Sequence, residues 1–322
     1  MIVVWRVNTH CNLNCRFCAY ARDLTIPRVA AKPADILAFA ETLAAYQRET
    51  GNRVLVSWLG GEPFLWAPLL EISAALVDEF GLEVSATTNG SVLGSRTLRG
   101  KVIRHFRELT VSVDGPASFH DEVRQWPRGF EKLAANIRFL QAERRAAGVG
   151  PLLRVNTVLM RDNVELFPQL CHELADWGID EISFNALGGN DRPEFHRIHR
   201  LLPQQVRWLA AELPELRRSL AARGVRLAGA PEYLARLHAS AEGKPLTIPN
   251  CHPGEQFLFV TERGVVSPCS FTSDEYGVPL AELNTVASLL SIPKRFNARR
   301  LAAPSAWCRD CPSTQIFGKF AA

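Results

Sequence analysis

The chain has 322 residues, of which 47% are hydrophobic and 22% charged, and its formal net charge is +4. This composition is that of an ordinary globular protein, and so small a positive excess gives no reason to expect a nucleic-acid partner. The most apolar stretch, residues 64–82, is interrupted by Pro68, Glu71, Asp78 and Glu79 and is not a membrane span. The N-terminus lacks the order of a signal peptide, so we expect a cytoplasmic protein with no membrane partner.

Two hydrophobic periodicities alternate along the first two thirds of the chain. Short apolar runs predict strands, and apolar residues recurring every three or four positions predict amphipathic helices. The strands are expected at residues 2–7, 53–59, 82–87, 109–113, 152–159 and 181–185. The helices are expected at residues 34–50, 67–80, 95–105, 130–147, 164–177 and 202–224. Six strands alternating with helices predict an α/β protein with a parallel sheet and right-handed crossovers, either open or closed into a barrel.

Three cysteines follow the first expected strand, spaced four and then three positions apart: Cys11, Cys15 and Cys18. Without an export signal, such cysteines are better explained as metal ligands than as disulfide partners. Thiolates favour iron–sulfur clusters or zinc. A four-iron cluster normally takes four cysteines, so three would leave one iron open to a ligand that is not protein. The alternative is a zinc site, for which the adjacent His10 offers a fourth ligand.

This loop resembles the signature of the radical S-adenosylmethionine (SAM) superfamily, C-x3-C-x2-C with an aromatic residue, here Phe17, before the last cysteine. In that superfamily the open iron chelates the amino and carboxylate groups of SAM, and one electron cleaves SAM to a 5′-deoxyadenosyl radical. The resemblance implies that Cys11, Cys15 and Cys18 hold the catalytic [4Fe–4S] cluster. It also implies a partial (β/α)6 TIM-like barrel, in which functional residues gather at the C-terminal ends of the strands.

Two further motifs lie at expected strand ends. Gly60-Gly61-Glu62-Pro63 follows the second strand and matches the GGEP element that binds the amino group of SAM in the family. Asn89 belongs to a T-N-G sequence after the third strand, which in the family lies beside SAM. Alone, either motif could be an ordinary turn. Together with the cysteine loop, in this order, they indicate a cofactor site.

The fourth expected strand ends in S-x-D-G-P, followed by H-D-x-x-R, a string that resembles radical SAM enzymes with a C-terminal SPASM or Twitch extension. There the serine and arginine, here Ser112 and Arg124, hold the ribose and carboxylate of SAM, and Asp114 is assigned to the same cofactor site. Arginine suits a carboxylate because its planar fork donates two parallel hydrogen bonds. Alternatively, Arg124 is a surface residue that pairs with Asp121. Asn156, in the fifth strand, is also assigned to SAM, although an inward polar residue can be satisfied by backbone.

The other cysteines fall into two classes. Cys171 lies on the apolar face of an expected helix and is predicted to be a small buried hydrophobe. After a connection at residues 229–249, a short module with an expected hairpin at residues 257–266 contains Cys251, Cys269, Cys308 and Cys311. Four cysteines in so small a module predict a metal site that helps to hold it together.

The spacing in this module resembles the C…G-x4-C opening of SPASM and Twitch domains. Because it has only four cysteines, the resemblance is to the Twitch type, with one fully ligated [4Fe–4S] cluster. The alternative is a zinc ribbon, since paired cysteines also suit tetrahedral zinc.

A basic segment follows the sixth expected strand. It contains His196 and His199 among Arg192, Arg197 and Arg200. These side chains either line the mouth of a substrate site or form an ordinary solvated surface, and the sequence does not decide between the two.

We therefore expect a radical SAM core at residues 1–228 and a Twitch-like α+β auxiliary domain at residues 229–322, with two [4Fe–4S] clusters and SAM as cofactors. The expected reaction removes a hydrogen atom from a substrate C–H bond, with flavodoxin or ferredoxin as reductant. The resemblance favours a ribosomal peptide substrate, modified by crosslinking, epimerisation or oxidation. The alternative is dehydrogenation or epimerisation of a small molecule such as an aminoglycoside-type intermediate. A hypothesis of another class is a zinc-stabilised binding protein without catalysis.

Overall fold

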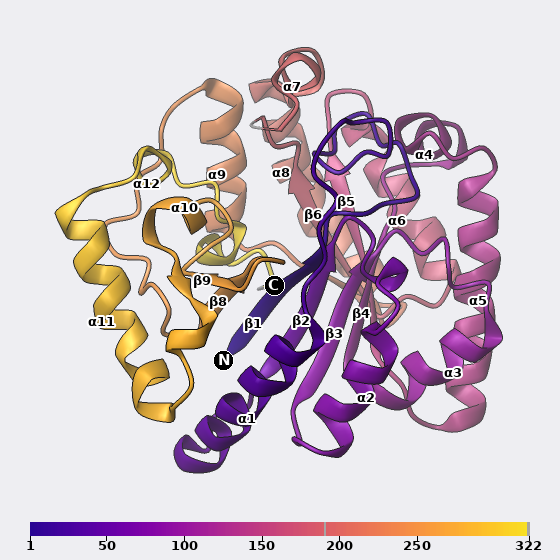
Figure 1. Cartoon of the computed structure of the whole chain (residues 1–322). Helices are drawn as coiled ribbons and strands as arrows, with labels where there is room; N and C mark the ends of the chain where they lie inside the picture. The colour runs from indigo at the N-terminus through magenta and orange to yellow at the C-terminus, as the bar shows by residue number, and fades with distance from the viewer. Residues whose placement is uncertain (190, 321–322) are drawn as a thin grey trace.

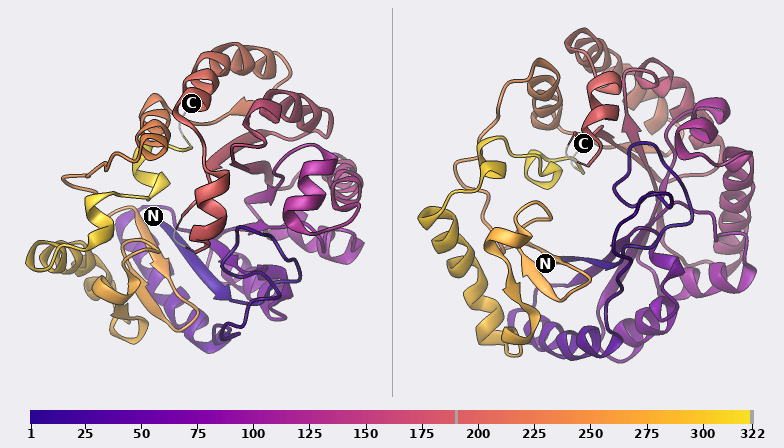
Figure 2. Two further views of the ribbon diagram at one scale, coloured as in Figure 1. Left: turned by 90° about the horizontal axis from the view of Figure 1, so that it is seen from above. Right: turned by 45° about the horizontal axis from the view of Figure 1, so that its top comes forward.

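The computed structural model describes residues 1–189 and 191–320. It contains one ten-stranded sheet, in the order β10-β9-β8-β1-β2-β3-β4-β5-β6-β7. The sheet curls into an open ring with helices around its outside (Figures 1 and 2). In the described part of the chain, no helix is both long and apolar enough to cross a membrane.

Six parallel strands form the main part of the ring. They are β1 (Ile2–Asn8), β2 (Leu55–Gly60), β3 (Glu83–Thr88), β4 (Glu108–Ser112), β5 (Leu152–Leu159) and β6 (Glu181–Ala186). Each overlaps a predicted strand, so the α/β class and the parallel sheet are confirmed, and the sheet is open rather than closed. Because the strands are parallel, their C-terminal ends share one edge of the sheet.

The helices that cover the strands also overlap the predicted ones. They are α1 (Pro33–Thr50), α2 (Leu69–Asp78), α3 (Arg96–His105), α5 (Gly129–Ala147), α6 (Phe167–Asp176) and α8 (Pro203–Ala221). Short 3-10 turns precede two of them, η1 (Pro63–Leu65) and η2 (Val164–Leu166). Helices α4 (Ala117–Arg124) and α7 (Pro193–His199) lie in the same part of the chain and were not predicted. Alternate residues of β1, namely Val3, Trp5 and Val7, are buried in the core between sheet and helices. The other residues of β1 therefore face the inside of the ring.

The segment predicted as a plain connection contains a helix, α9 (Pro231–Glu242), which follows the two-residue strand β7 (Arg226–Leu227). In the sequence, Pro231 and Gly243 suggest a segment without regular secondary structure. In the structure they lie at the two ends of this helix. Pro231 occupies the first turn, where a missing N–H is tolerated, and Gly243 ends the helix at a φ of 70°. Tyr233 and Leu237 bury one face of α9.

The C-terminal part of the chain continues the same sheet. β8 (Phe257–Val260) and β9 (Val265–Ser267) form the predicted hairpin, and β10 (Val278–Pro279) pairs with β9. On its other side β8 pairs in parallel with β1, from Ile2 opposite Phe257 to Trp5 opposite Val260. The remaining elements are α10 (Ser273–Tyr276), η3 (Leu280–Glu282), α11 (Val286–Ala302), α12 (Ala306–Arg309) and η4 (Thr314–Phe317). The division into domains near residue 229 stays a prediction.

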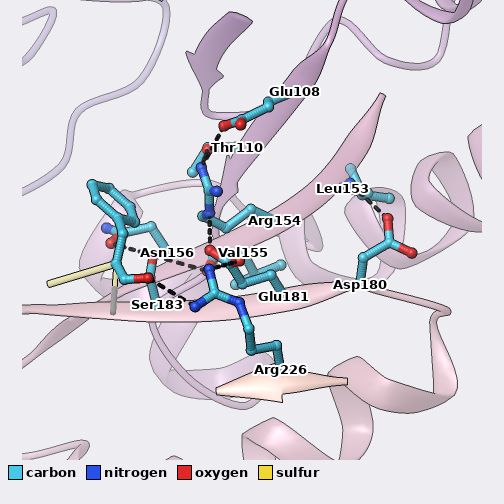
Figure 3. A network of polar contacts seen from close by, with 11 residues as sticks. Glu108, Thr110, Leu153, Arg154, Val155, Asn156, Asp180, Glu181, Ser183 and Arg226 are labelled. Atoms are coloured by element: carbon cyan, nitrogen blue, oxygen red, sulfur yellow. Dashed lines mark hydrogen bonds and ion pairs between the residues drawn. The ribbon is translucent and has the colours of Figure 1, made fainter. Parts of the chain in front are cut away.

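A network of ion pairs lies at the N-terminal ends of the strands (Figure 3). Arg154 at the start of β5 pairs with Glu181 of β6 and, at 3.0 Å, with Glu108 of β4. Glu181 is buried and also pairs with Arg226. The ring of Phe320 lies 4.9 Å from the Arg154 guanidinium, so the C-terminal segment packs against the same network. This edge is occupied by structural contacts, which leaves the opposite edge for function.

Replacing Gly243 by Ala tests the end of α9. A Cβ there would meet nothing within 4 Å, so only the positive φ opposes the substitution. We expect Gly243→Ala to lower the free energy of unfolding by about 1 kcal/mol, measured by urea denaturation. Gly100 in α3 is the control, because it also has open space around it but has helical backbone. Gly100→Ala should raise the unfolding free energy by about 0.5–1 kcal/mol, and effects of equal sign would contradict the assignment.

Candidate functional site

The three N-terminal cysteines lie together in the loop after β1. The Cys18 N–H donates to the Cys15 carbonyl at 3.1 Å, and the Arg16 N–H donates to the Val123 carbonyl of α4 at 3.0 Å. Burial raises the pKa of all three thiols, that of Cys15 to about 12. The charges of Cys18 and Cys11 contribute to this rise in the pKa of Cys15, and Arg124 opposes it. Such thiols become stable thiolates when a soft metal centre binds them.

The surroundings of these sulfurs fit an iron–sulfur cluster. Asn89 Nδ2 lies 3.8 Å from Cys11 Sγ, and the Tyr20 N–H donates to Cys18 Sγ at 3.4 Å. Hydrogen bonds to sulfur and burial are two means by which proteins tune such clusters. His10, the fourth ligand in the zinc alternative, is exposed. Among residues 1–189 and 191–320, no three His, Cys, Asp or Glu side chains are grouped so that they could hold a single metal ion.

The Gly60–Pro63 motif packs directly against the cysteine loop. The Gly61 N–H donates to the Asn8 carbonyl at 3.0 Å, and the Glu62 N–H donates to the His10 carbonyl at 2.6 Å. A Cβ on Gly61 would lie 2.1 Å from the His10 carbonyl oxygen. Only glycine permits so close an approach, so this motif and the cysteine loop form one unit.

Glu62 is completely buried and connects β2 with the end of β3. Its Oε1 accepts from Thr88 Oγ1 at 2.7 Å, and its Oε2 accepts from the Asn89 N–H at 2.7 Å. Burial raises the pKa of Glu62 to about 7, and these donors oppose the rise. Asn89 in turn donates from Nδ2 to Asn12 Oδ1 at 2.9 Å. The third predicted motif is thus bonded to both of the first two.

Arg124 is buried among these groups, with 6% of its surface exposed. Its Nε donates to Asp114 Oδ2 at 2.8 Å, so the predicted alternative of a surface residue paired with Asp121 is wrong. The Asp121 carboxylate instead accepts from the Phe130 N–H at 2.8 Å. Burial lowers the pKa of Arg124, but Asp114 and the thiols of Cys15 and Cys18 outweigh this and raise it. Arg124 therefore stays charged beside the cysteine loop.

The outer nitrogens of Arg124 keep their hydrogen-bonding capacity. Within the described residues, Nε to Asp114 is the hydrogen bond that Arg124 makes, and none involves Nη1 or Nη2. The guanidinium also lies 5.8 Å from the ring of Phe17, the aromatic residue before Cys18. A charged fork with free N–H donors beside a metal site is suited to a ligand carboxylate.

Ser112 and Asn156 lie side by side on neighbouring strands. Ser112 is the last residue of β4, and it stands opposite Asn156 of β5 in the sheet register. The next strand contributes Ser183, whose Oγ donates to Asn156 Oδ1 at 3.1 Å. One row across the sheet therefore presents three polar side chains toward the inside of the ring.

The four C-terminal cysteines line a second site, a cavity of about 440 Å³. Burial raises the pKa of the Cys311 thiol to about 11, and the other three thiols raise it further. The loop that carries Cys308 and Cys311 is held to the preceding segment, since the Cys311 N–H donates to the Leu246 carbonyl at 3.0 Å. Four half-buried cysteines around one cavity match the number of ligands of a fully ligated iron–sulfur cluster. Cys171, by contrast, is buried in α6, as predicted.

Residues 5–147 match the model of the Radical SAM superfamily. By this match, residues 5–147 are similar to a radical SAM domain.

The chain is similar both to a curated relative and to solved structures. A protein named AdoMet-dependent heme synthase from Methanosarcina barkeri is 26% identical over 291 residues, which cover 84% of this chain and 76% of that protein. Among solved structures, Streptococcus suis SuiB bound to precursor peptide SuiA has a TM-score of 0.67 at 14% identity, over 100% of this chain and 71% of that one. Native anSMEcpe with bound AdoMet has a TM-score of 0.66 at 15% identity, over 97% and 88% of the two chains. At these identities the two structures show a shared fold alone.

The sequence did not identify several residues that shape the candidate site. Arg28 holds the cysteine loop, since its guanidinium donates to the carbonyls of Thr9 at 2.6 Å and Ala21 at 2.7 Å. Arg6 of β1 donates to Tyr20 Oη at 2.8 Å and pairs with Glu262 beyond β8 at 2.5 Å. These arginines lack a motif, and their partners are far apart in sequence, so no local signal could have identified them.

Two more unpredicted residues surround Asp114. The Asp114 N–H donates to His120 Nδ1 at 3.2 Å, and the Asp114 carbonyl accepts from Asn163 Nδ2 at 2.5 Å. The second carboxylate oxygen of Asp114 accepts from the Val158 N–H at 2.9 Å. Every polar group of Asp114 is thus used within the protein, and its carboxylate holds Arg124 in place.

Asp114→Asn tests this arrangement. The substitution keeps the shape but leaves the buried Arg124 charge without its partner, which costs about 3–5 kcal/mol of unfolding free energy. Urea denaturation of anaerobically purified protein measures the loss. The exposed pair of Arg128 and Glu131, at 3.0 Å, provides the control. Glu131→Gln should change stability by less than about 1 kcal/mol, and an equally small effect of Asp114→Asn would show that the buried pair is unimportant.

Proposed function

We propose that this chain is a radical SAM enzyme that removes a hydrogen atom from a substrate C–H bond. The observation that carries the proposal is that Cys11, Cys15 and Cys18 lie in one loop beside the free fork of Arg124. A cluster held by Cys11, Cys15 and Cys18 keeps one iron without a protein ligand, and Arg124 lies where it can bind a carboxylate next to that iron. When bound, the cluster and SAM together supply a 5′-deoxyadenosyl radical.

The residues of the chain bind and orient the cofactor in this proposal. Arg124 holds the SAM carboxylate, and the Gly60–Pro63 motif holds the amino group. Ser112 and Asn156 contact the ribose. Asn89 lies between the cysteine loop and SAM. The tight packing of Gly61 on the cysteine loop supports this assignment, because it fixes the amino-group site relative to the cluster. Orientation and exclusion of water are the contributions expected of the protein when a cofactor carries the chemistry.

We also propose a Twitch-like auxiliary [4Fe–4S] cluster on Cys251, Cys269, Cys308 and Cys311. Four thiolates saturate such a cluster, so it would not bind substrate directly. Its role would be structural, or it would exchange electrons with the substrate. Cluster potentials span about −700 to +450 mV, so accepting an electron from the substrate carbon radical is feasible. A zinc-stabilised protein without catalysis is the competing explanation for the same four thiols.

For the substrate we propose a ribosomal peptide. The similarity of fold to a protein bound to its precursor peptide supports this choice. The second candidate is a carboxylated small molecule of the tetrapyrrole class, and the relative named as a heme synthase favours it. In either case the proposed reductant is flavodoxin or ferredoxin, and the proposed location is the cytoplasm.

Cys15→Ala tests the first part of the proposal. Reduced parent protein should convert SAM to 5′-deoxyadenosine and methionine, because the N-terminal thiols hold the cluster that SAM binds. Cys15→Ala should abolish this product, as measured by liquid chromatography. Cys171→Ala is the control, since Cys171 is remote from both groups of thiols, and it should retain cleavage. Equal cleavage by Cys15→Ala and the parent would refute the assignment.

Iron analysis tests the auxiliary cluster. The reconstituted parent should contain roughly eight irons per chain, as two four-iron clusters. Changing both Cys308 and Cys311 to Ala should leave roughly four irons and should preserve uncoupled SAM cleavage, because the N-terminal thiols are untouched. A parent protein with roughly four irons and one zinc would rule out the second cluster.

A further inference from the structure

A second cavity, of about 420 Å³, lies between the C-terminal end of β6, α9 and the segment around α12. Its volume is within the range of small-ligand sites, about 300–1,000 Å³. In Figure 1, α7, α9 and α12 lie along the same end of the ring, where the C-terminal ends of the strands are found. None of the residues assigned above to SAM lines this cavity.

The cavity lies between the two groups of cysteines. Leu187 lines it and also belongs to a small hydrophobic cluster that includes Phe17, the residue before Cys18. On the other side, Trp307 and Pro312 line both this cavity and the one that contains the four C-terminal thiols. Residues that line the cavity thus also belong to the packing around each group of cysteines. That is the position a substrate needs if it reacts near SAM and exchanges an electron with the auxiliary site.

One strong cation lines the cavity. The side chain of Arg236 in α9 is 11% exposed and pairs through Nη1 with Asp310, whose side chain is 50% exposed. Within the described residues this is the hydrogen bond that the Arg236 guanidinium makes. The other N–H groups of the fork are thus available to a ligand in the cavity. Asp310 Oδ1 also accepts from the Leu246 N–H at 3.0 Å, so Asp310 keeps a partner when a ligand replaces it in the fork.

The rest of the lining suits a ligand that is partly apolar. Leu187, Leu237 and Trp307 contribute apolar walls, and Ser240 and His196 contribute polar groups. Burial and the charge of Arg200 lower the pKa of His196, so its ring is neutral and adds no second cation. His199, the other histidine of the basic segment, instead contacts Asp162 at 2.5 Å. Of the two histidines of this segment, His196 therefore lines the cavity, and His199 attaches α7 to Asp162.

We propose that this cavity is the substrate site and that Arg236 binds a carboxylate of the substrate, which replaces Asp310 in the fork. The inference rests on the proposed radical SAM function and adds the chemical class of the substrate. Arginine recognises a carboxylate through two parallel hydrogen bonds, so the substrate presents this group toward α9. The carboxylate belongs either to an acidic residue of a peptide or to an acid side chain of a tetrapyrrole.

Equilibrium binding to the reconstituted holoenzyme, with SAM and without reductant, tests the proposal. The two probes are coproporphyrin III and an acetylated, amidated pentapeptide with a central glutamate; the same peptide with glutamine is its uncharged counterpart. One of the charged probes should bind, and which one binds identifies the source of the carboxylate. Arg236→Gln should weaken that binding at least about tenfold, since it removes a charge-assisted pair. Asp310→Asn should strengthen it several-fold, because it removes the competing carboxylate.

Arg309→Gln is the matched control, because Arg309 lies in the same turn as Asp310 but does not line the cavity. It should bind the probe as the parent does. Arg236→Lys, which keeps the charge but loses the fork, should give an intermediate affinity if Arg236→Gln proves unstable by thermal denaturation. Binding of neither probe, or equal losses in Arg236→Gln and Arg309→Gln, would overturn the proposal. Failure of the parent to cleave SAM would refute the proposed function separately, because probe binding is measured without that reaction.

Discussion

The cofactor site depends on the buried carboxylate of Asp114. It binds Arg124 through one oxygen and the Val158 N–H through the other, so it joins the ends of β4 and β5 to α4. A desolvated ion pair needs good geometry and partners for its remaining polar atoms. The Asp114 carboxylate meets both conditions, while the outer N–H groups of Arg124 stay available to a ligand. The position of the Arg124 fork beside the cysteine loop is therefore determined by the sheet. Loop flexibility has little influence on it.

The other motif residues form a chain of contacts between neighbouring strands. Gly61 lies against the loop after β1, Glu62 accepts from the end of β3, and Asn89 returns to the cysteine loop. Glu62 shows how two physical terms compete at one residue, since burial favours its neutral form while its hydrogen-bond donors favour the carboxylate. Each motif thus positions the next one, and the site forms only when adjacent strands are in register.

Much of this arrangement could be predicted from the sequence, because strand and helix periodicities and the spacing of Cys11, Cys15 and Cys18 are local features. The parallel sheet follows from the alternation of elements, whereas its open form was implied only by the resemblance to the radical SAM superfamily. The contacts of His120 and Asn163 with Asp114 could not be predicted, since they depend on how α4 and the loop after β5 fold back on β4. Helix α9 was missed because Pro231 and Gly243, which mark its ends, have the same sequence signature as a turn.

The pairing of β8 with β1 has a consequence for how the chain can be divided. β1 is an interior strand only because β8 covers one of its sides, and it is the strand that leads into the cysteine loop. A fragment ending at residue 228 would present β1 as a bare edge with unpaired N–H and C=O groups, which is a template for intermolecular strand addition. Such a fragment would tend to aggregate even with all of the residues proposed to bind SAM present. The parts that carry the two cysteine sites are therefore inseparable for expression and solubility, although their chemistry is distinct.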